Sequence, residues 1–241
     1  MSAIPAPSPL VVLITGATGP SGRAVARRFA ADGARVAVNG SDPARLAALV
    51  SDLGVPADTV LAVPGDLTDP AVARDVVAAV ESAFGGPDVL AHLVGGWTGG
   101  TAVVDLDHAE VRRMLDQHLW TTLHVLQAAL PGMASRGFGR VVAVSSPFAA
   151  VPGPRGASYA IAKAAEEVLL RTVAREAAAD GVTANILVIR TLDDERSRAA
   201  QPTAKTAGWT TPDELAGAVA WLASPAAAAV TGARIPLDGR G

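Results

Sequence analysis

Short apolar runs alternate with longer amphipathic stretches along most of the chain. The first run, residues 10–14, is apolar throughout, which is typical of a strand that is covered on both faces. Later runs are separated by stretches that carry valine, leucine and alanine at helical spacing. The pattern predicts strands at 10–14, 35–38, 60–63, 89–94, 140–145, 183–189 and 233–237, and helices at 21–31, 42–53, 70–84, 108–130, 157–179 and 212–223.

This alternation of strands and helices predicts an α/β fold with a single doubly wound parallel sheet, the Rossmann arrangement, and helices on both faces. No internal repeat and no linker divides the chain. We therefore expect a disordered, proline-rich lead at 1–9 and a single domain at 10–241. Ligands of such sheets bind beyond the carboxyl ends of the strands, where the strand order reverses. The longest stretch without clear periodicity, about 190–208, is the expected substrate lid.

Composition narrows the possible classes of protein. The formal net charge of -3 provides no basic field, so we expect no nucleic-acid partner. The chain has no cysteine, and its four histidines lack the spacing of zinc motifs, so we expect neither disulfides nor a metal site. No stretch predicts a membrane span, and the N-terminus lacks the basic region of a signal peptide. A soluble, cytoplasmic protein is the expectation.

A glycine-rich turn follows the first strand and opens the first helix. Gly16 permits a tight turn, Gly19 leaves room for a pyrophosphate near the backbone, and Gly22 lets the helix pack closely on the sheet. The free N–H groups and the positive end of the helix favour phosphate oxygens. The turn therefore predicts dinucleotide binding. The alternative is a strand–helix corner without a ligand.

The corner after the second strand bears on the choice between NAD and NADP. An acid there would bind the ribose 2′-hydroxyl of NAD, whereas basic residues accept the 2′-phosphate of NADP. Gly40 and Ser41 occupy this corner, with Arg23 or Arg45 nearby, and no carboxylate repels a phosphate. We therefore expect NADP(H) to be narrowly preferred over NAD(H). Asp66, after the third strand, is either an acceptor for the adenine amino group or a carboxylate at a helix N-terminus.

Tyr159 and Lys163 are four residues apart on an expected helix and therefore project from one face. An isolated tyrosine titrates near pKa ~10, and a neighbouring ammonium lowers this pKa because it favours the phenolate. Such a pair can exchange protons near neutral pH. Tyr159 is the only tyrosine in the chain. The alternative is an exposed tyrosine beside a solvated lysine.

Together these features resemble the short-chain dehydrogenase/reductase family over nearly the whole chain. Ser146 precedes Tyr159 by thirteen positions, which is the spacing of the catalytic serine in that family. The other matching landmarks are the glycine turn, the Asp66-Leu67 pair, residues 139–142, Ser145 beside Ser146, Lys163, residues 182–185, and the ending 231–239.

The resemblance implies hydride transfer between NAD(P)(H) and a carbonyl or alcohol of a small-molecule substrate. Tyr159 would be the general acid/base, Lys163 would hold the nicotinamide ribose and lower the tyrosine pKa, and Ser146 would bind the substrate oxygen. Implied cofactor contacts are Gly16, Thr18, Gly19, Gly22, Ser41, Asp66, Leu67, Gly95, Tyr159 and Lys163, and implied substrate contacts are Ser146, Trp97 and Tyr159. The resemblance also implies a homo-oligomer, either a dimer or a homotetramer.

Several positions depart from the pattern of the family. His118 stands where the family has an asparagine that supports a water relay to the lysine, so His118 either replaces it as a catalytic residue or merely packs. Ile189 and Arg190 stand in place of an expected Pro-Gly pair, and Gly19 is one position early in the turn. Such departures leave the substrate open. They also allow a catalytically weak cofactor-binding sensor or scaffold.

One branch of the family, quinonoid dihydropteridine reductase, is similar at several of the unusual positions. The similar segments are 95–100 with Trp97, 120–121, 191–193 and 208–210. Trp97 could stack on a flat heterocycle, or it could anchor a loop or contact another subunit. Reduction of a conjugated imine is therefore an alternative function. Ser146, and the absence of an acid at Gly40, differ from that branch.

Overall fold

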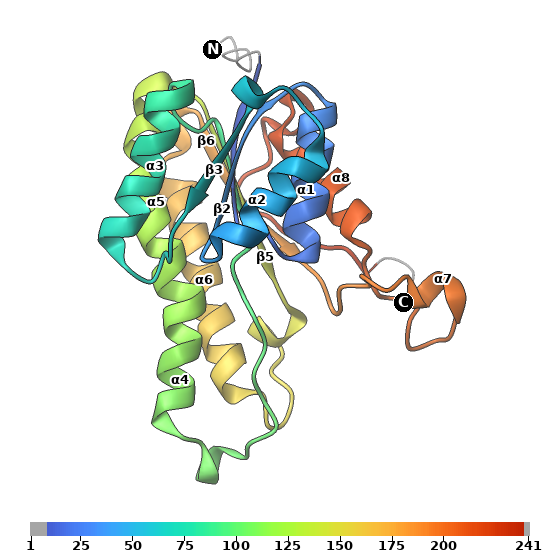
Figure 1. Ribbon diagram of the computed structural model, residues 1–241. Helices are drawn as coiled ribbons and strands as arrows, with labels where there is room; N and C mark the ends of the chain where they lie inside the picture. The colour runs from blue at the N-terminus through green and yellow to red at the C-terminus, as the bar shows by residue number, and fades with distance from the viewer. Residues whose placement is uncertain (1–8, 239–241) are drawn as a thin grey trace.

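The computed structural model describes residues 9–238, which form a layered α/β structure (Figure 1). Seven parallel strands form one sheet in the order β3-β2-β1-β4-β5-β6-β7. They are β1 (Val11–Thr15), β2 (Arg35–Gly40), β3 (Val60–Pro64), β4 (Val89–His92), β5 (Gly139–Ser145), β6 (Val182–Val188) and β7 (Arg234–Pro236). The strand order reverses between β1 and β4, and this is where such sheets bind ligands.

Helices cover both faces of the sheet. They are α1 (Pro20–Ala31), α2 (Pro43–Leu53), α3 (Pro70–Phe84), α4 (His108–Leu115), α5 (Thr121–Arg136), α6 (Ala157–Glu176), α7 (Ser197–Ala200) and α8 (Pro212–Ala223). Helices α3, α5 and α6 pack on one face, and α1, α2 and α8 pack on the other (Figure 1). The predicted fold class is therefore confirmed.

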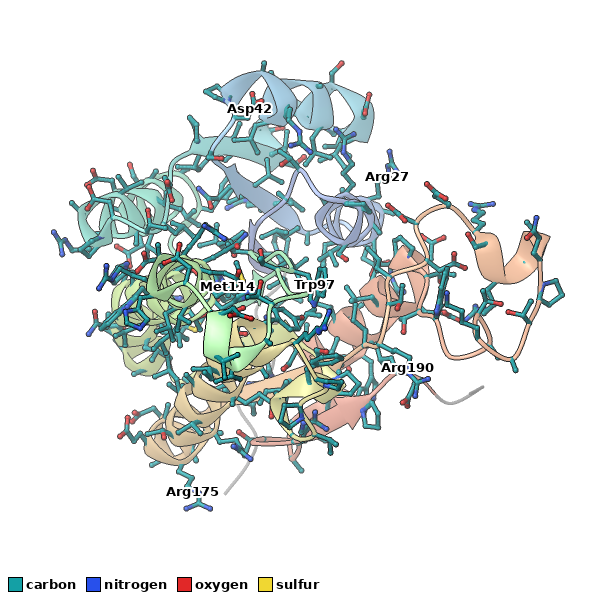
Figure 2. The ribbon with its side chains drawn as sticks, turned by 90° about the horizontal axis from the view of Figure 1, so that it is seen from below. Arg27, Asp42, Trp97, Met114, Arg175 and Arg190 are labelled. Atoms are coloured by element: carbon teal, nitrogen blue, oxygen red, sulfur yellow. The ribbon has the colours of Figure 1, made fainter. Side chains whose placement is uncertain are left out.

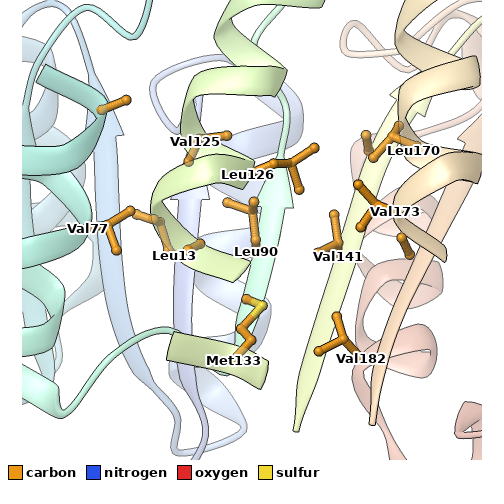
Figure 3. Packing of buried hydrophobic residues seen from close by; sticks show 14 of the residues in the cluster. Leu13, Val77, Leu90, Val125, Leu126, Met133, Val141, Leu170, Val173 and Val182 are labelled. Carbon is orange, nitrogen blue, oxygen red and sulfur yellow. The ribbon is translucent and has the colours of Figure 1, made fainter. Parts of the chain in front are cut away.

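The alternation of side chains along each strand explains why the strands are apolar throughout. In β1, Leu13 belongs to the cluster beneath α3, α5 and α6, whereas Ile14 belongs to the cluster beneath α1, α2 and α8. Figure 3 shows the first cluster, in which Leu90 and Val141 lie opposite Leu126. A fully buried leucine of this kind contributes about 1.5–3 kcal/mol to the stability of the fold.

Short polar residues and prolines begin the helices as the sequence predicts. The Asp42 carboxylate accepts hydrogen bonds from the N–H groups of Ala44 and Arg45 and so caps α2, which begins at Pro43. At α8, Thr211 and Glu214 form a capping box. Within residues 9–238, no helix is both long and apolar enough to cross a membrane.

The structure differs from the sequence-based expectation at the ends of a few elements. The fourth strand ends at His92, so Leu93 and Val94 leave the sheet and enter the binding crevice. The helix predicted at 108–130 is α4 and α5, joined by the π-helical turn Asp116–Trp120. Helix α5 continues through Pro131 to Arg136 because its later turns still bury apolar side chains.

Two predictions concern the segments at the edges of the fold. The expected lead at 1–9 lies, except for Pro9, outside the described residues, as does Gly239 of the last landmark. The segment 190–208 is not wholly irregular, because it contains the single turn of α7 and projects away from the sheet in Figure 1. Its role as a lid stays a prediction.

Candidate active site

Two adjoining cavities lie beyond the carboxyl ends of the central strands, with volumes of about 550 Å³ and about 440 Å³. Leu93, Val94 and Gly95 line both, so the cavities meet along the segment that follows β4. Their sizes are in the range of small-molecule sites. Of the predicted residues, Ser146, Tyr159, Lys163, His118 and Trp97 border the larger cavity, and Gly16, Thr18, Gly19, Ser41, Asp66 and Leu67 border the smaller one.

In the glycine turn, some glycines are required by close packing within the protein and another borders open space that a ligand could occupy. A side chain at Gly16 would place its Cβ 2.6 Å from the carbonyl oxygen of Leu93, and one at Gly22 would meet the Cα of Ala17 at 2.5 Å. Gly22 borders neither cavity, so its absent side chain serves the contact between α1 and the backbone of the turn at Gly16 and Ala17. At Gly19 the nearest atom would be 3.6 Å away, so the protein itself leaves room there. An open space above a helix N-terminus fits a dinucleotide phosphate.

At the corner after β2 the smaller cavity is lined by Gly40, Ser41 and Arg45, whereas the neighbouring Asp42 carboxylate does not border it and caps α2. The guanidinium of Arg45 donates a hydrogen bond to the carbonyl oxygen of Thr18, with an N–O distance of 3.1 Å. Asp66 does not cap α3, since Asp69 does. Instead, Asp66 Oδ1 accepts two hydrogen bonds from Thr68, which holds the turn after β3.

Ser146, Tyr159 and Lys163 converge on the larger cavity from two elements. Ser146 follows β5 and is buried, and its Oγ accepts a hydrogen bond of 3.3 Å from the N–H of Phe148. Tyr159 lies on the first turns of α6, with its ring edge-on to the rings of His118 and Phe148, at centroid distances of 5.5 and 6.3 Å. The three functional groups therefore share one wall of the cavity.

Burial raises the pKa of Tyr159 above the ordinary value of a tyrosine. The positive charge of Lys163 and a hydrogen bond from Ser146 lower this pKa, and the negative charge of Glu166 raises it further. Lys163 thus acts in the predicted direction, but the net lowering that the sequence suggests is wrong for this structure. The reason is that removal of the phenolate from water outweighs the attraction of the lysine.

Lys163 is buried and has two partners. Its ammonium donates to the carbonyl oxygen of Val144 at 2.7 Å and to Glu166 Oε2 at 2.6 Å. The second carboxylate oxygen, Glu166 Oε1, accepts from the hydroxyl of Thr122 at 3.2 Å. Burial raises the pKa of Glu166, and the contact with Lys163 lowers it. Glu166 is not among the residues predicted from the sequence. Its position three residues after Lys163 on one helix is the signal that indicates an ion pair with Lys163.

His118 lies within the π-helical turn. Turns of this kind often occur at functional sites. Its Nε2 donates to the carbonyl oxygen of Gly96 at 2.9 Å, because a carbonyl can only accept. Burial, followed by the charge of Lys163, lowers the pKa of His118 to about 3, so the ring is neutral at physiological pH. Its Nδ1 is buried and has no hydrogen-bond partner among residues 9–238.

The rim of the larger cavity carries an aromatic and a basic side chain. Trp97 is 64% exposed and borders the cavity, and Arg190 borders it from the start of the predicted lid. Figure 2 looks onto this side of the molecule, with Trp97 near the centre and Arg190 toward the segment that carries α7. No carboxylate of the described residues lines this cavity. Nowhere in residues 9–238 do three histidine, aspartate or glutamate side chains gather in a group that could hold a metal ion.

Comparisons with known proteins agree with this geometry. Residues 16–239 match a family model described as enoyl-(acyl carrier protein) reductase. The chain is 35% identical to (2S)-[(R)-hydroxy(phenyl)methyl]succinyl-CoA dehydrogenase subunit BbsC of Thauera aromatica, covering 92% of this chain and 90% of that protein. It is 30% identical to D-beta-hydroxybutyrate dehydrogenase of Rhizobium meliloti, covering 94% and 96%.

Solved structures are similar over the same length. An oxidoreductase of the short chain dehydrogenase/reductase family from Burkholderia thailandensis has a TM-score of 0.84 and 34% identity, covering 97% of this chain and 92% of that chain. An NADPH-bound short chain oxidoreductase from Pseudomonas aeruginosa, described as containing an atypical catalytic center, has a TM-score of 0.85 and 26% identity, covering 97% and 96%.

Proposed function

The chain belongs to the short-chain dehydrogenase/reductase family of oxidoreductases, and we propose that it interconverts a carbonyl and an alcohol with NAD(P)(H), using Tyr159 as the general acid/base. The observation that carries this proposal is that Ser146, Tyr159 and Lys163 border one cavity, which adjoins the glycine-lined cavity. One cavity offers proton-exchange chemistry, and the other offers backbone N–H groups to phosphates.

The residues of the smaller cavity fit a nicotinamide dinucleotide. Gly16, Thr18 and Gly19 would form the phosphate turn, and Gly22, outside the cavity, would let α1 pack close behind it. Ser41 would bind the adenosine ribose, Asp66 and Leu67 the adenine, and Gly95, together with Tyr159 and Lys163 of the larger cavity, the nicotinamide end. When bound, the cofactor supplies or accepts the hydride. We propose NADP(H) over NAD(H), because Ser41 and Arg45 border the cavity at the corner after β2. NADPH in a structural relative supports this preference.

The side chains of the larger cavity divide the remaining work. In carbonyl reduction, Tyr159 donates its proton to the substrate oxygen as the carbonyl carbon receives the hydride. The Ser146 hydroxyl, which hydrogen-bonds Tyr159 in this structure, would donate its proton to the same substrate oxygen and stabilise the developing charge. Lys163 then stabilises the phenolate that remains. His118 would position the substrate or a water through its free Nδ1 rather than carry a charge.

The direct test is a turnover screen with NADPH and NADH against ketones, 3-oxoacyl thioesters, sugar lactones and a quinonoid dihydropterin. Tyr159→Phe should lower turnover of any substrate found by about 10²- to 10⁴-fold, because the general acid is lost. Binding of NADPH, followed by fluorescence titration, should change little. If Tyr159→Phe retained full turnover, the proposed role of the phenol would be wrong. Tight cofactor binding without turnover of any compound would favour a sensor.

A second candidate function rests on Trp97. Its ring is 64% exposed at the cavity rim, so it is free to stack on a flat heterocycle such as a dihydropterin. Under this alternative, turnover of quinonoid dihydropterin should far exceed that of simple ketones. Trp97→Ala should then raise KM for the pterin and leave cofactor binding unchanged.

We also propose that residues 10–241 act as one domain, with 190–208 as the lid and a dimer or tetramer as the working state. Three large apolar side chains remain exposed, Trp120 on the π-helical turn and Ile161 and Val168 on α6, which supports burial against a second copy of the chain. Light scattering on the purified protein tests this, and a monomer at micromolar concentration would contradict it. The cytoplasmic location stays a prediction.

A further inference from the structure

The positive charge beside Tyr159 is not isolated. The Lys163 ammonium lies 2.6 Å from Glu166 Oε2, and both side chains are nearly inaccessible to water, with exposed fractions of 5% and 1%. A pair of opposite charges at this distance acts on a third group as a dipole, whose field is weaker than that of one charge. The phenol of Tyr159 therefore experiences less positive potential than a lysine alone would provide: the charge of Lys163 lowers its pKa, and the charge of Glu166 raises it by a smaller amount.

Contacts from three elements fix this pair in place. Lys163 is held from β5 by the carbonyl oxygen of Val144, and Glu166 is held from α5 by the hydroxyl of Thr122. The same hydroxyl also donates to the carbonyl oxygen of His118 in the π-helical turn, which is the nearer of the two acceptors that share its single proton. The ammonium and the carboxylate therefore have little freedom to separate.

The other titratable groups around the pair do not replace Glu166. His118 and His92 both face it, and burial together with the charge of Lys163 lowers the pKa of each to about 3, so both are neutral. Glu167, the next acid on α6, is paired with Arg234 of β7, with both carboxylate oxygens 3.1 Å from Nε. Within the described part of the chain, Glu166 is the one carboxylate that forms an ion pair with Lys163.

We propose that Glu166 is a positioning residue that fixes the Lys163 ammonium and offsets its charge, and thereby sets the pH range in which Tyr159 exchanges its proton. This inference rests on the proposed acid/base role of Tyr159. Its consequence is that the phenol keeps its proton to a higher pH than it would beside an unpaired lysine. The protonated form is the one needed for carbonyl reduction, and alcohol oxidation should gain activity only as the pH rises.

The sequence offers a clean spectroscopic test. Because Tyr159 is the only tyrosine in the chain, the near-ultraviolet absorbance of tyrosinate reports this residue alone. Glu166→Gln keeps the shape of the side chain and an acceptor oxygen for Lys163, and removes only the negative charge. The titration midpoint of Tyr159 should then fall by about one pH unit, because an unpaired ammonium favours the phenolate. An unchanged midpoint in the folded variant would overturn the proposal.

A matched control uses the neighbouring acid. Glu167→Gln makes the same chemical change one residue away, in a group whose charge is already offset by Arg234. Its tyrosine titration should coincide with that of the unaltered protein. An equal downward shift in both variants would mean that any loss of negative charge on α6 acts on Tyr159, and the specific role of Glu166 would be overturned.

A second variant keeps the proposal testable if Glu166→Gln does not fold. Lys163→Met combined with Glu166→Leu removes both charges and replaces them with apolar side chains, a change that buried pairs often tolerate. If the pair contributes little net charge, the midpoint of Tyr159 should stay within about one pH unit of its original value. A larger rise would show that Lys163 acts without compensation, which contradicts the proposal.

Kinetics provide a separate readout. If an alcohol substrate is found, kcat/KM for its oxidation increases with pH. In Glu166→Gln the midpoint of this increase should lie at a lower pH than in the unaltered enzyme, by the same amount as the midpoint of the tyrosine titration. If no substrate is found, the proposed function fails, but the spectroscopic titration still decides the role of Glu166 because it requires no turnover. The two failures are therefore distinguishable.

Discussion

The cleft consists of the smaller and the larger cavity, which meet at Gly95, and different parts of the chain form the two halves. The half around the glycine turn uses backbone, and its key positions are defined by the absence of a side chain at Gly16, Gly19 and Gly22. The half around Tyr159 uses side chains, among them a buried ion pair. The first half offers open space and backbone N–H groups that suit phosphates. In the second half, the pKa of the phenol depends on how the neighbouring charges offset one another.

This difference predicts how a substitution should damage each half of the cleft. Where backbone forms the site, one added carbon atom either collides with the protein or occupies the space of the ligand. Where a buried ion pair forms the site, removal of one partner leaves a charge that the interior cannot solvate. The second kind of damage should therefore be larger, and it should depend on pH.

The largest expected effect is the loss of one member of the ion pair. Lys163→Met leaves Glu166 buried without its cation and should lower the free energy of unfolding by about 3–5 kcal/mol at neutral pH. The deficit should shrink in acid, because the isolated carboxyl has a raised pKa in the folded state and is stabilised by taking up a proton. Chemical denaturation at several pH values measures both effects.

The double variant Lys163→Met with Glu166→Leu provides the control. It should recover most of the stability, since no unpaired charge remains, but it should not recover turnover. Equal instability of the single and double variants would mean that packing, rather than charge, controls this half of the cleft. The contrast between the two halves would then lose its basis.

The next largest effect distinguishes two roles within the glycine turn, namely packing at Gly22 and cofactor binding at Gly19. Gly22→Ala should lower the free energy of unfolding by about 1–3 kcal/mol, because the new Cβ would sit 2.5 Å from the Cα of Ala17. Gly19→Ala should leave stability nearly unchanged, since its Cβ would meet no atom closer than 3.6 Å. It should instead weaken NADPH binding about tenfold or more, because the methyl group enters the space of the phosphates.

Thermal unfolding with and without NADPH separates these outcomes. Gly22→Ala should lower Tm in both conditions, whereas Gly19→Ala should mainly lose the stabilisation that the cofactor provides. If Gly19→Ala unfolded as easily as Gly22→Ala without cofactor, the space above Gly19 would serve packing rather than a ligand.

The sequence predicted the fold and the place of the glycine turn between β1 and α1 well, because those features are local, and the binding of a cofactor at this turn stays a prediction. The apolar strands, the proline-started helices and the glycine turn each depend on residues within a few positions of one another. Predicted ends were wrong where tertiary contacts decide, as in the π-helical turn that divides the helix expected at 108–130. Nothing in the local pattern marks that extra residue in the helix.

The half around Tyr159 was only partly predictable. Tyr159 and Lys163 follow from helical spacing, but the net effect on the phenol depends on burial, which a sequence pattern does not measure. Glu166 was missed because a glutamate on a helix is usually solvated, and only the fold shows that it is enclosed beside Lys163 and Thr122. The neutral state of His118 likewise follows from burial and from the charge of Lys163, and the carbonyl oxygen of Gly96, 22 positions earlier, decides only which ring nitrogen carries the proton.

The smallest expected effect concerns the preference between the two cofactors. Arg45 borders the smaller cavity beside Ser41 and is exposed, so its contact with a 2′-phosphate would be screened by water. Arg45→Ala should raise KM for NADPH by about five- to tenfold and leave KM for NADH unchanged, since only NADPH carries that phosphate. Arg23→Ala is a close control, because Arg23 also donates to the carbonyl oxygen of Thr18 but does not border this cavity. An equal loss of NADPH affinity in both variants would mean that the arginines act by holding the glycine turn, and the backbone half would then owe its cofactor preference to the turn rather than to a direct charge contact.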